Sequence, residues 1–312
     1  RTLAIRMRCR AKTGPNVVGA ASHSDRKRSA PCGSAGSGAR RRGVRFLCSA
    51  VFGVDWSAGL TLNATMILQT RTPYDVLTPR RLPGVAPFEM ADWLHVDEAY
   101  AGQMAERVRL LSERRSEVLR LDPDAHAAAE ELLDMVLAHL PEGFVSEGPR
   151  VACPDGRVVE IDRADPLGTL GHIVQEDLCL MEPRDGVHVL TGAVLCFPAS
   201  WLLAEKFLRP LVGIHAPVEA YDDGLAARVQ RLFDGVQAGR PVWRYNLLHY
   251  DDPTLFQPRS EQARRPHVDQ ETAPFTRSER QCLVRLPKTG AVVFSIHTYV
   301  VARRAGGAVP AT

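Results

Sequence analysis

Histidine is the residue type in this chain best suited to bind a metal. His215 stands in the stretch GIHAPV, between a β-branched residue and an Ala-Pro step. A neutral imidazole can bind a metal ion or the iron of haem, but a histidine among apolar residues can equally pack with its ring nitrogens hydrogen-bonded. Four other histidines compete with it on equal terms: His172, His188, His249 and His297. The residues alone therefore leave the role of His215 open.

Other polar side chains that could take part in chemistry lie in strand-like segments. Arg244 and Asn246 alternate in VWRYNLL, and a polar triplet precedes a later strand: Glu279, Arg280 and Gln281. Glu176 and Asp177 are adjacent, but neighbours on a strand point to opposite faces and form no carboxylate pair by proximity alone. Surface charge or a helix cap is the simpler interpretation of these two residues.

Known catalytic signatures are absent from the sequence. It contains no G-x-S-x-G elbow, H-E-x-x-H helix, Walker lysine loop or G-x-G-x-x-G turn, so the corresponding hydrolase, zincin, nucleotide-triphosphatase and Rossmann interpretations lack their motif. The seven cysteines are scattered, with no C-x-x-C pair, which fits neither a zinc ribbon nor an iron-sulfur cluster. We expect reduced thiols and a cytoplasmic location.

Composition and charge narrow the class of protein. The chain has 312 residues, 45% of them hydrophobic and 24% charged, as in a globular protein. No apolar run approaches the roughly 18 residues of a membrane-spanning helix. Residues 1–65 hold 12 Lys and Arg against two acidic residues, so the remainder is acidic, with a net charge near −7. This charge argues against nucleic acid as the main partner.

The N-terminal half divides into an extension and a helical segment. Residues 1–65 show no periodicity and predict a disordered basic extension, either dispensable or mis-assigned, or else a targeting peptide. Within residues 66–150, apolar residues at helical spacing predict a helix over 97–111. A second helix is predicted from Asp122 and Pro123, which can cap and begin it, to Pro141 and Gly143, which end it.

After residue 150 the pattern changes to strands. A small hairpin is predicted at 151–162 and a larger one at 176–198, turning at residues 184–186. A helical region follows, and then three strands at 241–250, 280–287 and 291–301. We expect an α+β fold over 151–303, namely a PAS-like five-stranded antiparallel sheet with helices on one face, and a flexible tail at 304–312. Such a sheet can form a cup for a ligand, with His215 in its helical lid.

The last predicted strand has two different faces. Its apolar residues share one face: Val292, Phe294, Ile296, Thr298 and Val300. Ser295, His297 and Tyr299 share the other, because side chains alternate along a strand. This polar face is either solvated or part of a site.

Five blocks of sequence, in order, resemble one family. They are PLGTLGHIVQEDLCLM, LCFPASWLLAEK, PLVGIHAPVEAY, VWRYNLLHYDDPTLFQP and SERQCLVRLPKTGAVVFSIHTYV, within a resemblance running from about Trp93 to Val301. The family is that of the haem-dependent oxidative N-demethylases. The resemblance implies a PAS-like domain that binds haem b through an axial histidine and oxidatively removes a methyl group from a small secondary amine such as dimethylamine. It also implies O2 as oxidant, formaldehyde as by-product, and electrons from NADPH through a separate flavin and iron-sulfur (ferredoxin-type) reductase.

The resemblance also assigns residues. It implies His215 as the proximal iron ligand, with His172 in reserve, and Arg244 and Lys206 as partners of the haem propionates. Three further residues are expected near the haem or the substrate: Glu279 and Tyr299 as catalytic groups and Arg280 as a cofactor-binding group. One position departs from the pattern, since RYNLL has Leu247 where the family commonly has Trp. The pocket is then roomier, or the substrate differs.

Two other functions fit the same pattern. A PAS-like sensor or binding protein would hold haem or another small ligand without turnover. A structural or assembly protein with an empty cup would hold no haem.

Overall fold

An antiparallel β-sheet with helices packed on it is the centre of the structure, a computed structural model. The structure describes residues 66–76, 84–215, 223–263 and 267–303, except for the side chains of His215 and Asp223. All of them belong to one compact unit, Leu62–Thr312. The predictions for residues 1–65 and 304–312 fall outside these ranges. No helix within them is long and apolar enough to cross a membrane.

The sheet has seven strands in the order β1-β8-β9-β10-β6-β7-β2, and every neighbouring pair is antiparallel. The strands are β1 (Ala86–Pro87), β2 (Leu119–Leu121), β6 (Asp177–Arg184), β7 (Val187–Val194), β8 (Val242–Tyr250), β9 (Phe275–Arg285) and β10 (Val292–Ala302). The β6–β7 turn places Asp185 and Gly186 at φ of 50° and 81°, as the predicted Asp-Gly turn requires. A separate small sheet of β3 (Val145–Glu147), β4 (Arg150–Ala152) and β5 (Val158–Glu160) contains the other predicted hairpin.

The N-terminal helices bury apolar stripes, and side chains cap α4 and the 3-10 turn before α3. They are α1 (Tyr100–Glu113), the short α2 (Arg115–Val118), α3 (His126–Ala138) and α4 (Pro166–Ile173), with 3-10 turns at Met90–Asp92 and Pro123–Ala125. Asp122 accepts a hydrogen bond from the Asp124 amide, as predicted for a cap. Asp165 caps α4 through the Gly168 amide, and a Cβ at Gly168 would lie 1.8 Å from the Asp165 carboxylate. A side chain at position 168 would therefore displace the carboxylate that caps α4.

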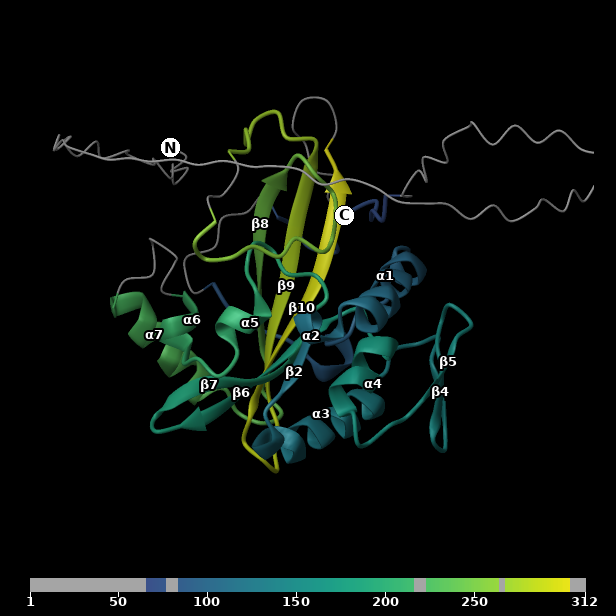
Figure 1. The fold of residues 1–312 in the computed structure, drawn as a ribbon, viewed down its shortest axis with the longest axis vertical. Coiled ribbons are helices and arrows are strands. Elements are labelled where there is room, and N and C mark those ends of the chain that lie inside the picture. The colour runs from purple at the N-terminus through teal and green to yellow at the C-terminus, as the bar shows by residue number, and fades with distance from the viewer. Residues whose placement is uncertain (1–65, 77–83, 216–222, 264–266, 304–312) are drawn as a thin grey trace, which may run out of the picture. The chain divides into compact units, whose positions relative to one another are not determined.

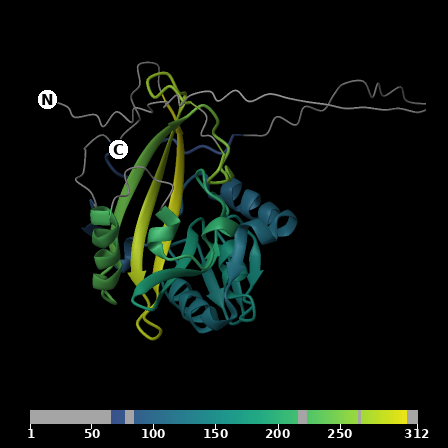
Figure 2. The ribbon, with the colours of Figure 1, turned by 60° about the vertical axis from the view of Figure 1, so that its left-hand side comes forward.

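The long strands β8–β10 separate two layers of helices (Figures 1 and 2). We call one side the α7 face; it carries Val242, Arg244, Asn246, Glu279, Gln281, Leu283, Phe294 and Ile296. Three helices, α5 (Leu203–Lys206), α6 (Leu211–His215) and α7 (Asp223–Gly235), pack on the apolar residues of this face. The other side, the α1 face, carries Trp243, Tyr245, Ser278, Arg280, Ser295, His297 and Tyr299. It is covered by residues 66–76 and 86–97 and by the N-terminal helices.

The α+β class and the antiparallel sheet are confirmed, with three corrections. The sheet has seven strands rather than five, because the short β1 and β2 join its edges. Helices cover both faces rather than one, because α1, α3 and α4 pack on the side opposite α7. The strand expected to begin at Arg280 begins at Phe275, which brings the polar residues of 277–279 into the sheet.

A buried ion pair joins the helices to the sheet. The Arg107 guanidinium, 0% exposed, lies 2.6 Å from the Asp177 carboxylate. Asp177 also accepts hydrogen bonds from the amides of Cys196 and Phe197. One carboxylate thus fixes α1, the start of β6 and the end of β7.

We expect Asp177→Asn to lower the free energy of unfolding by about 3 kcal/mol or more, because a buried guanidinium would lose its counter-ion. The surface pair Arg109–Glu113 offers a control, and Glu113→Gln is expected to change stability by less than about 0.5 kcal/mol. Urea unfolding measures both variants. Equal effects would contradict the role assigned to Asp177.

Candidate functional site

A carboxylate surrounded by polar groups lies on the α7 face. Glu279, 7% exposed, accepts hydrogen bonds from Asn246 Nδ2 at 2.8 Å and Gln281 Nε2 at 3.1 Å. Its other oxygen lies 3.8 Å from Arg277 Nε. These three residues come from β8 and β9, whose pairing places them on the same face as Glu279. Glu279 is therefore held in a fixed orientation.

Arg244 lies one step along β8 on the same face. It is half-buried, and burial lowers the pKa of its guanidinium while the charge of Glu279 acts in the opposite direction. Arg244 Nε is buried and has no hydrogen-bond partner among the described residues, and the same holds for Thr298 Oγ1. A buried donor without a partner is uncommon in folded proteins and favours a ligand at this place.

The end of α6 is fixed by Lys206. Its ammonium group donates a hydrogen bond to the Ile214 carbonyl at 2.5 Å and another to the Glu261 carboxylate. His215 is the next residue and the last of α6, and its side chain lies outside the described residues. Lys206, 4% exposed, thus holds the backbone immediately before the predicted iron ligand and already has a carboxylate partner.

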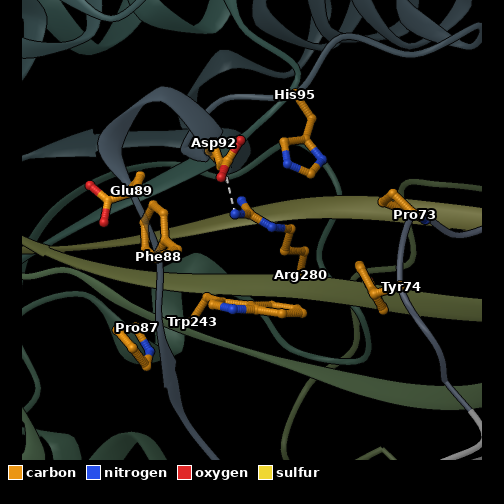
Figure 3. A pocket seen from close by; sticks show the side chains of 9 residues that line it. All are labelled: Pro73, Tyr74, Pro87, Phe88, Glu89, Asp92, His95, Trp243 and Arg280. Atoms are coloured by element: carbon orange, nitrogen blue, oxygen red, sulfur yellow. Dashed lines mark hydrogen bonds between the residues drawn. The ribbon is translucent and has the colours of Figure 1, made fainter.

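Arg280 and Tyr299, the other two predicted site residues, lie on the α1 face. Arg280 and Trp243 line a cavity there of about 510 Å³ (Figure 3). The Tyr299 hydroxyl lies 2.6 Å from Nδ1 of His95, and His95 lines the cavity. Because Glu279 and Arg280 are neighbours on β9, their side chains leave opposite faces of the sheet, and one ligand on one face cannot contact both.

His297 stands at the centre of a buried ionic cluster on the α1 face. Its Nδ1 lies 2.9 Å from Glu176 Oε1 and its Nε2 lies 3.0 Å from Asp97 Oδ2. Burial would lower the pKa of His297, but these hydrogen bonds and negative charges outweigh burial and raise its pKa to about 9. Burial would raise the pKa of Asp97, yet the hydrogen bond and charge of His297 lower it to about 2. His297 is therefore a doubly paired imidazolium at neutral pH.

His95 extends this cluster toward the cavity. Its backbone amide donates to Glu176 Oε1 at 2.9 Å. Burial, and then the charges of His297 and Arg280, lower the pKa of the His95 ring to about 3, so the imidazole is neutral at physiological pH. The ionic cluster therefore holds the segment from His95 to Asp97 against the sheet.

The other candidate histidines, His172, His188 and His249, lie on different elements. His172, on α4, has its Nδ1 2.7 Å from the Gly168 carbonyl of its own helix. His249 Nδ1 lies 3.0 Å from Thr276 Oγ1 on the α1 face. His188, on β7, lies against α7 with Nδ1 2.9 Å from Gln230 Nε2, while its buried Nε2 has no partner within the described ranges. In those ranges no three His, Cys, Asp or Glu side chains gather as a metal site.

Sequence reasoning missed Tyr74, Trp93, His95 and Asp97. They contact residues of β9 and β10 about 200 positions away, so no spacing could have paired them. The one available signal was the polar face of the last strand, which required buried polar partners if it was not solvated. Glu176 and Asp177, interpreted as surface charge or a cap, are each 1% exposed, which corrects that interpretation. Glu176 belongs to the cluster, and Asp177 to the buried pair with Arg107.

We expect the His297 cluster to make stability depend on pH. Because the pKa of His297 is higher in the folded state, its contribution is complete below about pH 6.5 and is lost as the pH rises toward 9. Urea unfolding of the native protein should therefore show falling stability over this window. His297→Gln should be less stable at pH 6 and should lose this alkaline slope, whereas the exposed His267→Gln should keep it. A slope that persists in His297→Gln would contradict the assignment.

Comparison with known proteins identifies a family. The model described as "Haem-dependent oxidative N-demethylase, alpha subunit-like" matches residues 84–305. The match covers most of the chain and spans every described strand and helix, including both faces of β8–β10. The chain therefore belongs to the family of proteins like the alpha subunit of haem-dependent oxidative N-demethylase.

Proposed function

We propose that this protein binds haem b between the α7 face and helices α5–α7 and oxidatively demethylates a small secondary amine there. The family supports the activity. The observation that supports the location is Arg244, a half-buried guanidinium whose Nε has no partner among the described residues and which lies on the sheet face on which these helices pack. When bound, haem supplies the redox chemistry by which O2 and electrons oxidise the N-methyl group and release formaldehyde.

The chemistry of the described residues on the α7 face supports the proposed haem. Propionates are carboxylates, and a guanidinium binds a carboxylate through paired N–H groups, so Arg244 is the propionate partner we propose. Apolar side chains packed between this face and the helices are the proposed contacts of the porphyrin; they include Phe233, Leu283, Phe294 and Ile296. Lys206 already pairs with Glu261, and we assign it instead the role of positioning the end of α6.

His215 remains the proposed axial ligand. It ends a helix whose residues Leu211 and Ile214 pack on the α7 face. His172 lies on α4, in the opposite layer, which makes it a weaker candidate. His188 has a free, buried Nε2 next to α7 and is the alternative that a test must separate from His215.

Glu279 is the proposed substrate-binding group. A secondary amine is protonated at neutral pH, and a carboxylate fixed by Asn246 and Gln281 can bind the resulting ammonium and hold its N-methyl groups in one orientation. The same carboxylate can accept the amine proton. Low exposure at Glu279 limits the water that competes for these hydrogen bonds.

The proposal includes a PAS-like organisation and a partner protein. Strands β7-β6-β10-β9-β8 are contiguous in the sheet, and α5–α7 lie between β7 and β8 in the chain and on one face, which supports the PAS-like assignment. Electrons are proposed to come from NADPH through a separate flavin and iron-sulfur reductase. The family description of an alpha subunit supports a partner of some kind.

We expect His215→Ala to lose most of the Soret absorbance of haem-reconstituted protein, because the axial nitrogen is removed. His188→Ala is the matched control and should keep haem content and band position. Spectra of the oxidised protein and of the reduced protein with carbon monoxide measure both. Loss of haem in His188→Ala alone would transfer the ligand role to His188, and a colourless native protein would refute haem binding.

We expect Glu279→Gln to keep its haem and to lower dimethylamine-dependent formaldehyde release about 100-fold or more, because the charge and proton acceptor are lost. An added electron donor makes the assay independent of the natural reductase. The exposed Glu271→Gln serves as control and should leave turnover unchanged. Haem binding without amine-dependent turnover in the native protein would favour a sensor, and full activity in Glu279→Gln would remove this residue from the site.

A further inference from the structure

The cavity on the α1 face is separate from the proposed haem site. Its lining includes Tyr74, Phe88, Glu89, Asp92, His95, Trp243 and Arg280 (Figure 3). Trp243 and Arg280 lie next to Arg244 and Glu279 in sequence and therefore on the opposite face of the sheet. Its volume of about 510 Å³ falls in the range of small-molecule sites, roughly 300–1,000 Å³.

Arg280 differs from the other buried cations of this protein. Four Lys or Arg side chains in the described ranges are almost wholly buried, and three of them lie within ion-pair distance of a carboxylate. The three pairs are Arg107–Asp177, Lys206–Glu261 and Arg277–Glu279. Arg280, 5% exposed, is the fourth, and no carboxylate of the described residues lies within ion-pair distance of it. A buried charge without a counter-ion is unfavourable, so an anion is expected beside it.

Hydrogen bonds hold the guanidinium of Arg280 in a fixed position and leave some of its N–H groups without an acceptor among the described residues. Nη1 donates to the Trp93 carbonyl at 2.8 Å and to Cys282 Sγ at 3.1 Å, and Nη2 donates to the Asp92 carbonyl at 2.5 Å. These bonds use three of the five N–H groups. The Nε–H and one N–H of Nη2 donate to no residue that the structure describes. Two N–H groups on neighbouring nitrogens are the arrangement that binds a carboxylate in two places.

Aromatic rings surround this guanidinium. Its Cζ lies 5.2 Å from the Phe88 ring centre and 5.4 Å from that of Trp243, within cation–π distance of both rings. The Tyr74 ring lies 5.4 Å from Trp243 and completes an aromatic wall. Such contacts keep the cation rigid and offer flat apolar surfaces to a ligand.

We propose that this cavity is a second binding site, which takes a small monocarboxylate with a flat apolar body. The ligand carboxylate is the counter-ion that Arg280 lacks, and its body packs against Tyr74, Phe88 and Trp243. The exposed carboxylates of Glu89 and Asp92 at the mouth repel further negative charge, which disfavours phosphates and polyanions. The neutral imidazole of His95 adds no charge.

Benzoate is a suitable probe, with neutral benzamide and cationic benzylamine as ligands of similar shape. We expect calorimetric titration of the full chain to detect benzoate binding with a dissociation constant below about 1 mM. Benzamide should bind at least about tenfold more weakly, because its amide gives the guanidinium a neutral partner. Equal affinities for benzoate and benzamide, tighter binding of benzylamine, or no benzoate binding would overturn the proposal.

Two variants locate the binding. Arg280→Gln should remove the preference for benzoate over benzamide. Since Arg280 is also a packing residue, the double variant Glu89→Gln/Asp92→Asn provides an independent test that leaves the floor of the cavity intact. Removing two negative charges from the mouth should strengthen benzoate binding by about twofold to tenfold at low salt. Glu113→Gln/Glu117→Gln, a remote exposed pair, should leave it unchanged. Unchanged affinity in the mouth variant would overturn the location.

The test is independent of the proposed haem chemistry. Because the cavity and the α7 face lie on opposite sides of the sheet, benzoate should bind haem-loaded and haem-free protein with equal affinity. Benzoate that binds only the haem-loaded protein, or that shifts the Soret band of the Arg280→Gln variant as much as that of the native protein, would place it at the haem and overturn the second site.

Discussion

Along a β-strand, successive side chains point to opposite faces of the sheet. On β9 two consecutive charged residues, Glu279 and Arg280, therefore lie on opposite faces. Glu279 lies among amide and guanidinium groups on the α7 face, whereas Arg280 lies among aromatic rings on the α1 face. The same alternation divides β8 and β10. Each long strand therefore contributes side chains to two different environments, one on each face of the sheet. Segments packed on both faces shield these side chains from water.

The α1 face is organised by charge rather than by apolar contact alone. The imidazolium of His297 joins Glu176, at the edge of β6, to Asp97, which precedes α1. Gln69 and Gln175 add hydrogen bonds to the same Asp97 carboxylate, so residues of four separate segments meet there. This cluster brings His95 and the backbone of Asp92 and Trp93 over β9, and these carbonyls in turn orient Arg280. The cavity beside Arg280 thus depends on a cluster that does not line it.

Sequence reasoning succeeded where local signals suffice. Asp122 with Pro123, and Asp185 with Gly186, specify a helix start and a tight turn through their own backbone preferences, and both were predicted. Helix α4 was missed because its stretch PLGTLGHI carries glycines that serve packing: a Cβ at Gly171 would lie 2.8 Å from Val194. The face of a strand was also predictable, but not its partner. The pairs His95–Tyr299 and Asp97–His297 join residues about 200 positions apart and depend on the complete fold.

The candidate site was predicted as one group of residues and is divided by the sheet into two. Glu279 and Arg244 share the α7 face, and Lys206 holds the end of α6. Arg280 and Tyr299 lie on the α1 face. A family resemblance gives the order of residue types along the chain but not the sheet face on which each side chain lies. The strand was predicted to begin at Arg280, so Glu279 fell outside it, and its face could not be compared with that of Arg280.

The pairing of β9 has a further consequence. Nine residue pairs join β9 to β8 and eleven join it to β10, so its register is fixed from both edges. A substitution at one position can alter one face and leave the other intact. An insertion or deletion of a single residue within β9 would instead exchange the side chains of the two faces over the rest of the strand, so that an arginine would replace a glutamate on one side and a glutamate an arginine on the other. Substitutions can therefore change the residues of one face without changing those of the other. The number of residues in β9, in contrast, is constrained by both faces together.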